Sequence, residues 1–383
     1  MFEFDENVEQ VARIKVIGVG GGGSNAVNTM IAARIDGVEF MVANTDAQAL
    51  RANLAAMRVQ LGTKLTKGLG AGANPEVGRE AAQEDRARLA ELLQGADMVF
   101  IAAGLGGGTG TGAAPVIAEV AREVGALTVA VVTKPFSFEG KQRMLKADEG
   151  VAELKQVVDS LILIPNDRLS GLAGKKMGIL DAFKPADDVL RQAVQGISDL
   201  ITTHGMINVD FADVKAAMSE RGMAMMGIGL AEGENRAVTA AQQAISSPLL
   251  EEIDISGAKG VLVNVTGSSS MTMDDYQEVA HIIHEKVHED ANIFIGLVIN
   301  EEMGEKIQVT AIATGFGCSF ATGKPAKNDT LGLPTTAPNK IDRDIPAFIR
   351  NQNQDKPRAS MRIGNYSEDE EYDIPTFLRK RVD

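Results

Sequence analysis

Two glycine-rich loops, each between a predicted strand and a predicted helix, constrain the fold of this 383-residue sequence more than any other feature. The first covers residues 18–25 and follows an apolar run at residues 14–19; the second covers residues 102–115 and follows another at residues 98–102. Glycine lets backbone amides approach an anion closely, and the helix that follows adds unpaired N–H groups and a positive dipole end. Each loop is therefore a candidate phosphate cradle.

The order of elements around these loops predicts the fold class. Short β-branched runs predict buried strands, and apolar residues at helical spacing predict helices between them. This alternation predicts an α/β fold with a Rossmann-type parallel sheet, helices on both faces, and a ligand site at the carboxyl ends of its strands. The expected strands are residues 14–19, 38–43, 98–102, 127–132 and 161–164, and the expected helices are residues 25–33, 79–94 and 113–124.

A long central helix and a smaller α/β unit are expected to follow. Within residues 186–204, apolar residues repeat at helical spacing and predict one buried stripe, formed by Leu190, Val194, Ile197 and Ile201. The smaller unit has expected strands at residues 260–266, 292–299 and 306–313, and expected helices at residues 234–245 and 274–290.

The last part of the chain is expected to be disordered. Six of the 12 prolines lie in residues 321–383, a stretch rich in polar residues that cannot bury enough apolar surface to offset its ordering entropy. The expected organisation is a nucleotide-binding domain at residues 11–185, the central helix at 186–205, a C-terminal α/β domain at 206–320, a flexible linker at 321–371 and a partner-binding peptide at 372–383.

Composition excludes several classes of protein. The 38 basic and 52 acidic residues give a net charge of −14, which argues against general nucleic-acid binding. The single cysteine, Cys318, excludes an intrachain disulfide framework and a four-cysteine zinc site, and favours a reducing cytoplasm. The acidic start lacks a signal-peptide pattern, and no apolar run is long enough to span a membrane, so we expect a cytoplasmic protein.

The first loop alone also fits a nicotinamide-dependent enzyme. Gly18, Gly20 and Gly23 match the G-x-G-x-x-G pattern, which is a weak signal by itself, and a tight turn without a ligand is a further alternative. A nicotinamide-binding unit has one such loop, however, whereas two loops at one sheet edge suit a longer polyphosphate held from both sides. The chain contains no G-x-x-x-x-G-K-[ST] motif, so this would be a phosphate site without a P-loop lysine.

The second loop carries a resemblance to a known family. The segment Gly-Gly-Gly-Thr-Gly-Thr-Gly at residues 106–112, together with residues 20–25, closely resembles the signature loops of the tubulin/FtsZ GTPase superfamily, and the resemblance extends over residues 11–320 and the extreme C-terminus. It implies a tubulin-like fold and a GTPase that is activated by self-assembly into filaments. It further implies assembly of the division ring at the septum, at midcell beneath the inner membrane.

The resemblance also implies a GTP site, residue by residue. One glycine loop would cradle the phosphates and the other would hold them from the opposite side, with loop 70–74 near the γ-phosphate and Mg²⁺, which is expected to be held through phosphates and water rather than by protein ligands. Phe183 would stack on the base, Asn166 would read the guanine edge, and Asp187 would accept its N–H groups. The full implied set is Gly21, Gly22, Gly23, Ser24, Asn25, Asn44, Asp46, Gly72, Gly107, Gly108, Thr109, Gly110, Thr133, Glu139, Arg143, Asn166, Phe183 and Asp187.

Asp210 and Asp213 precede and begin a predicted helix. Taken alone, such a pair is more often an N-cap aspartate with a first-turn acid. In the resembling family this loop points at the nucleotide of the next subunit, so the two carboxylates would be the catalytic residues that position the attacking water. Their presence argues against a third alternative, a nucleotide-binding scaffold that does not hydrolyse.

A zinc hydrolase is a further alternative, from a different class. Residues 284–288 match H-E-x-x-H within a predicted helix, and His281 lies one turn earlier. The simpler interpretation is the solvated face of an amphipathic helix, because no extended downstream histidine element exists.

The C-terminal residues resemble the family's partner-recognition peptide. The implied contact residues are Asp373, Ile374, Pro375, Phe377, Leu378 and Arg379. The implied partners are the membrane anchors FtsA and ZipA and regulators such as MinC. The same Asp-Ile-Pro-x-Phe-x-Arg pattern also occurs at residues 344–350, where it either allows bivalent docking or is a linker duplication without a role.

Overall fold

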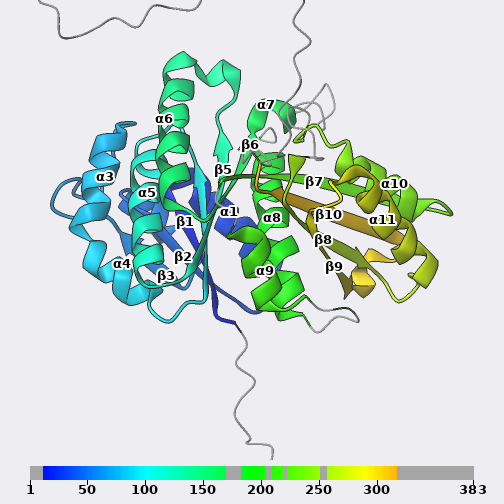
Figure 1. Cartoon of the computed structure of the whole chain (residues 1–383). Helices are drawn as coiled ribbons and strands as arrows, with labels where there is room; N and C mark the ends of the chain where they lie inside the picture. Colours follow the sequence, from blue (N-terminus) through cyan, green and yellow to red (C-terminus); the bar gives the residue numbers. More distant parts are fainter. Residues whose placement is uncertain are drawn as a thin grey trace, which may run out of the picture. The chain divides into compact units, whose positions relative to one another are not determined.

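The computed structural model describes residues 12–169, 183–203, 207, 209–219, 222–250 and 257–316. The described residues belong to a compact unit that ends at Phe320. Its strands are β1 (Ile14–Val19), β2 (Val38–Asn44), β3 (Met57–Gln60), β4 (Met98–Gly104), β5 (Leu127–Lys134), β6 (Ser160–Pro165), β7 (Gly222–Glu232), β8 (Gly260–Gly267), β9 (Asn292–Ile299) and β10 (Lys306–Thr314). They form one ten-stranded sheet in the order β3-β2-β1-β4-β5-β6-β7-β10-β8-β9 (Figure 1).

The first six strands are parallel, as predicted. Ile14 of β1 lies opposite Val38 of β2 on one side and Met98 of β4 on the other. The carboxyl ends of these strands therefore meet at one edge, and both glycine loops leave the sheet there.

The remaining strands continue the sheet with mixed directions. β7 pairs parallel with β6 and antiparallel with β10. β8 is antiparallel to β10 and parallel to β9. β7 therefore joins the two halves of the sheet.

Helices cover the sheet. They are α1 (Gly20–Ala32), α2 (Ala47–Arg51), α3 (Pro75–Glu84), α4 (Arg86–Leu93), α5 (Thr109–Glu123), α6 (Lys141–Val157), α7 (Asn166–Leu169), α8 (Lys184–Thr202), α9 (Phe211–Met218), α10 (Arg236–Ile245) and α11 (Met273–Lys286), with 3-10 turns η1 (Ser137–Glu139) and η3 (Glu301–Met303). One core packs α1 and α8 on one face of the parallel strands, and a second core packs α3, α4, α5 and α6 on the other. A third core places α10 and α11 over β7 to β10.

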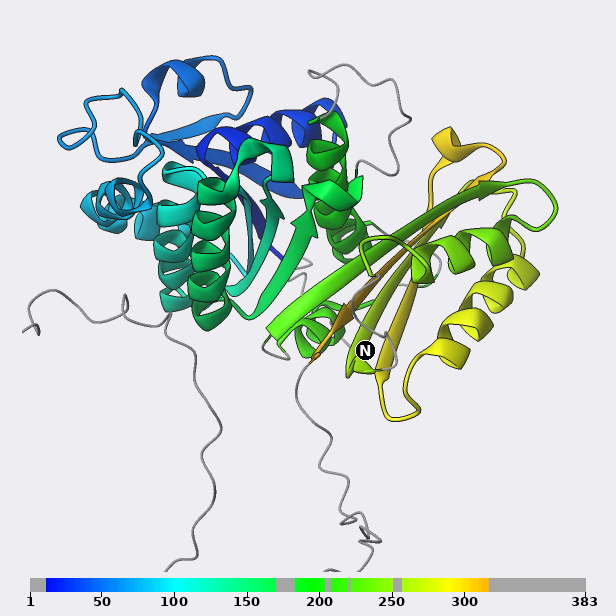
Figure 2. The ribbon, with the colours of Figure 1, turned by 90° about the horizontal axis from the view of Figure 1, so that it is seen from above.

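The long helix α8 runs between the two halves of the sheet (Figure 2). It contacts α1 and β5 on one side and β8 and β9 on the other. Three residues of the predicted stripe, Leu190, Val194 and Ile197, are fully buried, and Ile201 packs against the same core. The central helix is therefore confirmed, with bounds two residues earlier than expected.

Several predicted elements need correction. The first helix begins at Gly20, inside the glycine loop, rather than at Asn25. The helix expected at residues 79–94 is two helices that meet at Asp85. The helix expected at residues 274–290 ends at Lys286. The sequence prediction also omitted α6, β3 and β7.

The omission of β7 has a physical cause. Its glycines lower strand propensity, yet they are required here because α10 lies directly on the strand. A Cβ on Gly227 would lie 1.9 Å from the Ala244 carbonyl oxygen, and one on Gly229 would lie 1.9 Å from that of Ala240.

In the described part of the chain, no helix is both long and apolar enough to span a membrane.

Candidate nucleotide site

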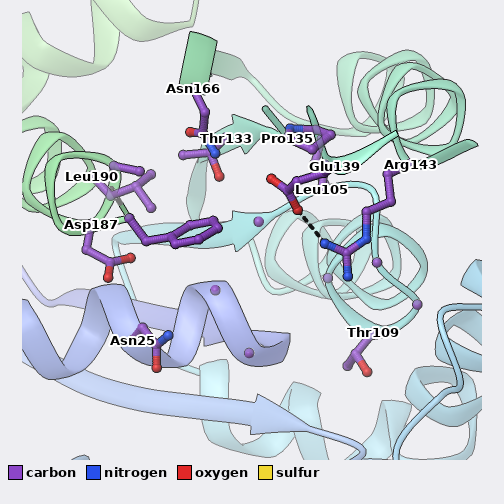
Figure 3. A pocket seen from close by; sticks show the side chains of 18 residues that line it. Asn25, Leu105, Thr109, Thr133, Pro135, Glu139, Arg143, Asn166, Asp187 and Leu190 are labelled. Carbon is purple, nitrogen blue, oxygen red and sulfur yellow. Dashed lines mark hydrogen bonds and ion pairs between the residues drawn. The ribbon is translucent and has the colours of Figure 1, made fainter. Parts of the chain in front are cut away.

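A cavity of about 450 Å³ opens at the carboxyl ends of β1, β4, β5 and β6 (Figure 3). Its volume is in the range of small-molecule sites, about 300–1,000 Å³. The lining residues are Gly21, Gly22, Asn25, Gly104, Leu105, Gly107, Gly108, Thr109, Gly110, Thr133, Pro135, Glu139, Arg143, Asn166, Phe183, Ala186, Asp187 and Leu190. In the view of Figure 3, Asn166, Asp187 and Leu190 lie toward one end, and Arg143 and Thr109 lie toward the other.

Three helix N-termini converge near the Thr109 end. A Cβ on Gly20 would lie 2.8 Å from the amide nitrogen of Gly110, so the first turns of α1 and α5 touch through their backbones. A Cβ on Gly112 would lie 1.8 Å from the Pro75 carbonyl oxygen, so α3 touches α5 in the same way. Neither α1 nor α5 has an acidic residue in its first turn. Their positive dipole ends are thus available to an anion.

Loop 70–74 lies behind the second glycine loop. A Cβ on Gly108 would lie 2.9 Å from the amide nitrogen of Asn74, and Asn74 accepts a hydrogen bond from the backbone of Glu76 as the N-cap of α3. The amide of Gly70 donates to the carbonyl of Thr45, whose hydroxyl is 2.7 Å from the hydroxyl of Thr109. The loop is therefore tied to the wall of the cavity.

The side of the cavity formed by η1 and α6 carries an ion pair. Glu139 bonds to Arg143 (Figure 3) and also accepts the backbone N–H of Phe136 at 2.9 Å. The backbone N–H of Ser137 donates to Asp167 at 2.9 Å, which fixes the same turn against α7. The guanidinium of Arg143 is thereby held on the cavity wall, where it can neutralise an anionic ligand.

The other end of the cavity has the groups that a base requires. Phe183 is 42% exposed, and its ring meets that of Phe136 edge-on, with ring centroids 5.5 Å apart. Asn166 is buried, and its side-chain oxygen has no hydrogen-bond partner among the described residues. Burial raises the pKa of the Asp187 carboxyl to about 6. An unsatisfied buried acceptor that lines a cavity indicates a ligand that donates a hydrogen bond.

Most of the implied nucleotide residues line this cavity, but some do not. Gly23 and Ser24 lie behind it: a Cβ on Gly23 would lie 2.1 Å from the Ala102 carbonyl oxygen, and the buried hydroxyl of Ser24 has no partner among the described residues. Asn44 is buried beneath the loops and accepts from the amide of Asp46, which is the N-cap of α2. Gly72 does not line the cavity wall either.

Asp210 and Asp213 lie elsewhere. Asp210 is the N-cap of α9 and accepts the Asp213 amide at 2.8 Å, so the local geometry is that of an N-cap aspartate with a first-turn acid. The end of α8, which leads into this loop, meets the start of β2, because a Cβ on Gly37 would lie 2.7 Å from the side chain of Thr202. The acidic loop is therefore at the amino-terminal edge of the sheet, and the cavity is at the opposite edge.

Sequence reasoning missed the apolar part of the lining. Gly104, Leu105, Pro135, Ala186 and Leu190 also line the cavity. Leu190 was predicted only as a core residue of the central helix, and it belongs to both environments. The position of Pro135 directly after the strand that ends in Thr133-Lys134 was a signal that could have placed it at the same edge.

The zinc alternative fails on geometry. His288 lies beyond the end of α11, so it does not share a helical face with His284. The Nδ1 atom of His284 bonds to the Ala280 carbonyl, and His281 pairs with Glu285. Among the described residues, no group of three or more His, Cys, Asp or Glu side chains is arranged to hold a metal ion. The linker and the C-terminal peptide, residues 321–383, lie outside the described residues.

Comparison with known proteins identifies the family. Residues 13–174 match the GTPase domain of the tubulin/FtsZ family, and residues 222–317 match the C-terminal domain of the FtsZ family. The cell division protein FtsZ of Pseudomonas aeruginosa is 52% identical over 397 residues, covering 100% of both chains. That of Coxiella burnetii is 52% identical over 385 residues, covering 99% of both.

Solved structures of similar proteins support the same assignment. An FtsZ dimer from M. jannaschii has 45% identity and a TM-score of 0.77, covering 85% of this chain and 95% of the other. A GTPγS-bound CetZ2 protofilament from Haloferax volcanii, with 19% identity and a TM-score of 0.69 over 79% of this chain and 93% of the other, shares the fold. The chain therefore belongs to the tubulin/FtsZ family and is a GTPase of its FtsZ branch, which excludes the nicotinamide-dependent alternative.

Proposed function

We propose that this GTPase forms head-to-tail filaments in cell division, and that each GTP is hydrolysed where one subunit meets the next. The observation that carries the proposal is the separation of two half-sites. The cavity lies at the carboxyl ends of the parallel strands, whereas the acidic loop of Asp210 and Asp213 follows the end of α8 at their amino ends. Because a subunit with complementary halves on opposite edges stacks without closing, its assembly is a filament.

In the proposed site, the base occupies the end near α8. Asp187 accepts two N–H groups of guanine, and Asn166 bonds to the same base; adenine does not present two adjacent N–H donors and is rejected. Phe183 stacks on the ring. The buried acceptor of Asn166 without a protein partner supports this assignment.

The phosphates occupy the other end. Backbone amides of Gly21, Gly22 and residues 107–110 hold them, helped by Arg143 and the converging helix N-termini. Among the described residues that line the cavity, the carboxylates are Glu139, which is paired with Arg143, and Asp187 at the base end. We therefore propose that Mg²⁺ is held by phosphates and water, and that it neutralises charge on the terminal phosphates.

The attacking water needs an orienting carboxylate that this cavity does not supply at its phosphate end. Helix α8 starts at the cavity and contains 19 residues, so it extends about 28 Å before the chain reaches Asp210. The acidic loop therefore acts on the nucleotide of a second copy. Two exposed apolar side chains near the cavity, Leu69 and Phe138, support the burial of this edge by another subunit.

The test is GTP hydrolysis measured against protein concentration, with light scattering alongside. We expect both signals to begin at the same threshold concentration. Asp213→Asn should assemble without hydrolysing; this change is preferred to one at Asp210, which caps α9. Hydrolysis strictly proportional to protein from the lowest concentration would mean that each subunit carries a complete site.

A mixing experiment sharpens this test. Asp213→Asn supplies an intact cavity, and a Gly107→Ala variant, whose added methyl meets no protein atom within 4 Å, supplies an intact acidic loop with an obstructed cavity. Mixing these two inactive variants should restore hydrolysis at the interfaces where the cavity of Asp213→Asn meets the acidic loop of Gly107→Ala. No recovery, with co-assembly demonstrated by scattering, would contradict the shared site.

The domain organisation and the partners belong to the same proposal. Residues 11–185 bind the nucleotide, the helix at 186–205 connects, and residues 206–320 complete the neighbour's site. The peptide at 372–383 docks on FtsA, ZipA or MinC and places the filament at midcell beneath the inner membrane. Spaced apolar residues followed by cations at residues 374–381 support docking in a partner's groove. Removal of residues 372–383 should abolish midcell placement and leave hydrolysis intact.

A further inference from the structure

Helix α6 reaches across to loop 70–74 through one side chain. The ammonium of Lys146 donates to the carbonyl of Ala73 at 2.6 Å. The two residues are 73 positions apart, and Lys146 lies one turn after Arg143 on the same helix. A second link between α6 and α3 is the ion pair of Glu153 with Arg79.

Lys146 meets this loop between Gly70 and Asn74, whose contacts tie the two ends of the loop to the cavity wall. Ala73 adopts a left-handed conformation with φ of 55°, which is unfavourable for a residue with a Cβ. Gly70 and Gly72 also have positive φ, and a Cβ at either would meet nothing within 4 Å. The loop is therefore open on this side, and the contact to Lys146 satisfies the carbonyl of its strained residue.

The position of the loop decides the shape of the phosphate end. Asn74, the next residue, packs against Gly108 of the second glycine loop, and Gly108 lines the cavity. A shift of Ala73 is transmitted through Asn74 to Gly108. We propose that Lys146 is a positioning residue, which fixes loop 70–74 so that the cavity wall fits a nucleoside triphosphate.

This inference rests on the proposed GTP site, and it concerns the terminal phosphate in particular. Loop 70–74 borders the Gly108 end of the cavity, away from Asn166 and Asp187. A loosened loop should reduce the affinity for GTP more than the affinity for GDP, which lacks the terminal phosphate. The base end should be unaffected.

The test compares three variants of the full chain. Lys146→Met keeps the alkyl stem and removes the donor, and Lys146→Arg keeps a cationic donor. Lys155→Met removes the same charge from an exposed position in the last turn of α6, away from the loop. Two quantities are measured: the affinities for GTP and GDP, and hydrogen exchange of the amides in residues 70–74 without nucleotide.

We expect Lys146→Met to speed hydrogen exchange in residues 70–74 and to weaken GTP binding about three- to tenfold, with a smaller change for GDP. Lys146→Arg should keep both the exchange rates and the nucleotide affinities close to those of the wild type, and Lys155→Met should leave both unchanged. Unchanged exchange in Lys146→Met overturns the tether, and an equal loss for GTP and GDP overturns the positioning role. Failure of the wild-type protein to bind GTP would instead contradict the proposed site, since exchange is measured without nucleotide.

Discussion

Asp187 is a carboxylate that burial makes difficult to ionise. It lies in the first turn of α8, partly buried, and burial raises its pKa to about 6 from 3.8. In the proposed site it must be ionised to accept two N–H groups of guanine. GTP affinity should therefore fall as the pH drops through about 6, by about tenfold at pH 5 relative to pH 7.5.

The stability of the nucleotide-free protein should change in the opposite direction. Because the folded pKa is raised, the folded state binds the proton more tightly, so the Asp187 contribution to the free energy of unfolding is largest below pH 3.8 and is lost as pH rises through 6.

GTP-binding titrations from pH 5 to pH 7.5 test the predicted loss of GTP affinity, with Asp187→Asn as the control for titration of the nucleotide's own phosphates. An identical pH dependence in wild type and Asp187→Asn would remove Asp187 from the site.

At the residue scale, the motif resemblance assigned several polar residues that line the cavity and left its aliphatic lining unassigned. Glu139, Arg143 and Asn166 were assigned to the site from the resemblance of their motifs, and the structure brings them to one cavity. Leu105 and Leu190 could not be assigned, because an aliphatic side chain looks the same in the sequence whether it faces a core or a ligand. For Leu190, only the packing of α8 against β5 decides this.

Two of the four glycines in helix α1 have different structural requirements. Gly21 lines the cavity, and a Cβ there would meet nothing within 4 Å. Gly23 faces the sheet, where a Cβ would lie 2.1 Å from the Ala102 carbonyl oxygen. The same substitution in the same helix should therefore have different consequences at the two positions.

We expect Gly21→Ala to raise the free energy of unfolding by about 0.5–1 kcal/mol, because alanine favours a helix, and to weaken GTP binding at least about tenfold by placing a methyl in the cavity. Gly23→Ala should lower the free energy of unfolding by at least about 2 kcal/mol, because the backbone must shift. Denaturant unfolding and nucleotide titration measure both. Equal destabilisation by the two changes would mean that α1 does not pack as described.

Helices and strands with a strong hydrophobic pattern were predicted from the sequence, and those with a weak one were not. β1 and β9 have the expected bounds because each is a short run in which apolar residues predominate. Helix α6 was missed although Ala147 and Leu154 are buried at helical spacing, because its charged and polar residues together outnumber its apolar ones and resemble a solvent-exposed segment. The early start of α1 could not be predicted, since glycine is a poor helix former and tertiary packing decides its conformation here.

For the whole molecule, the single sheet places the two proposed half-sites on opposite edges. This arrangement could not be derived from the sequence alone, because β7 joins the halves and its glycine-rich sequence was not recognised as a strand. With β7 in place, α8 and the strands set the direction in which subunits stack. Because hydrolysis is proposed to need both half-sites, it is proposed to depend on assembly.

The duplicated peptide in the C-terminal tail gives the last prediction. Asp344 and Asp373 begin two copies of the same pattern, 29 residues apart. A random coil of 29 residues has a root-mean-square span of about 30 Å. At that reach both copies are expected to bind neighbouring partner molecules, with the second binding event favoured by effective concentration. If so, Phe348→Ala should matter only where partner molecules are close together.

The measurement is binding of the full chain to purified FtsA immobilised at low and high density. At high density we expect Phe348→Ala to weaken binding at least about tenfold, within the range that linked sites can add; at low density it should have little effect. Phe377→Ala, in the copy that resembles the family's peptide, should weaken binding at both densities. Unchanged binding of Phe348→Ala at high density, with or without Phe377→Ala, would mean that the copy at residues 344–350 is a linker duplication without a role.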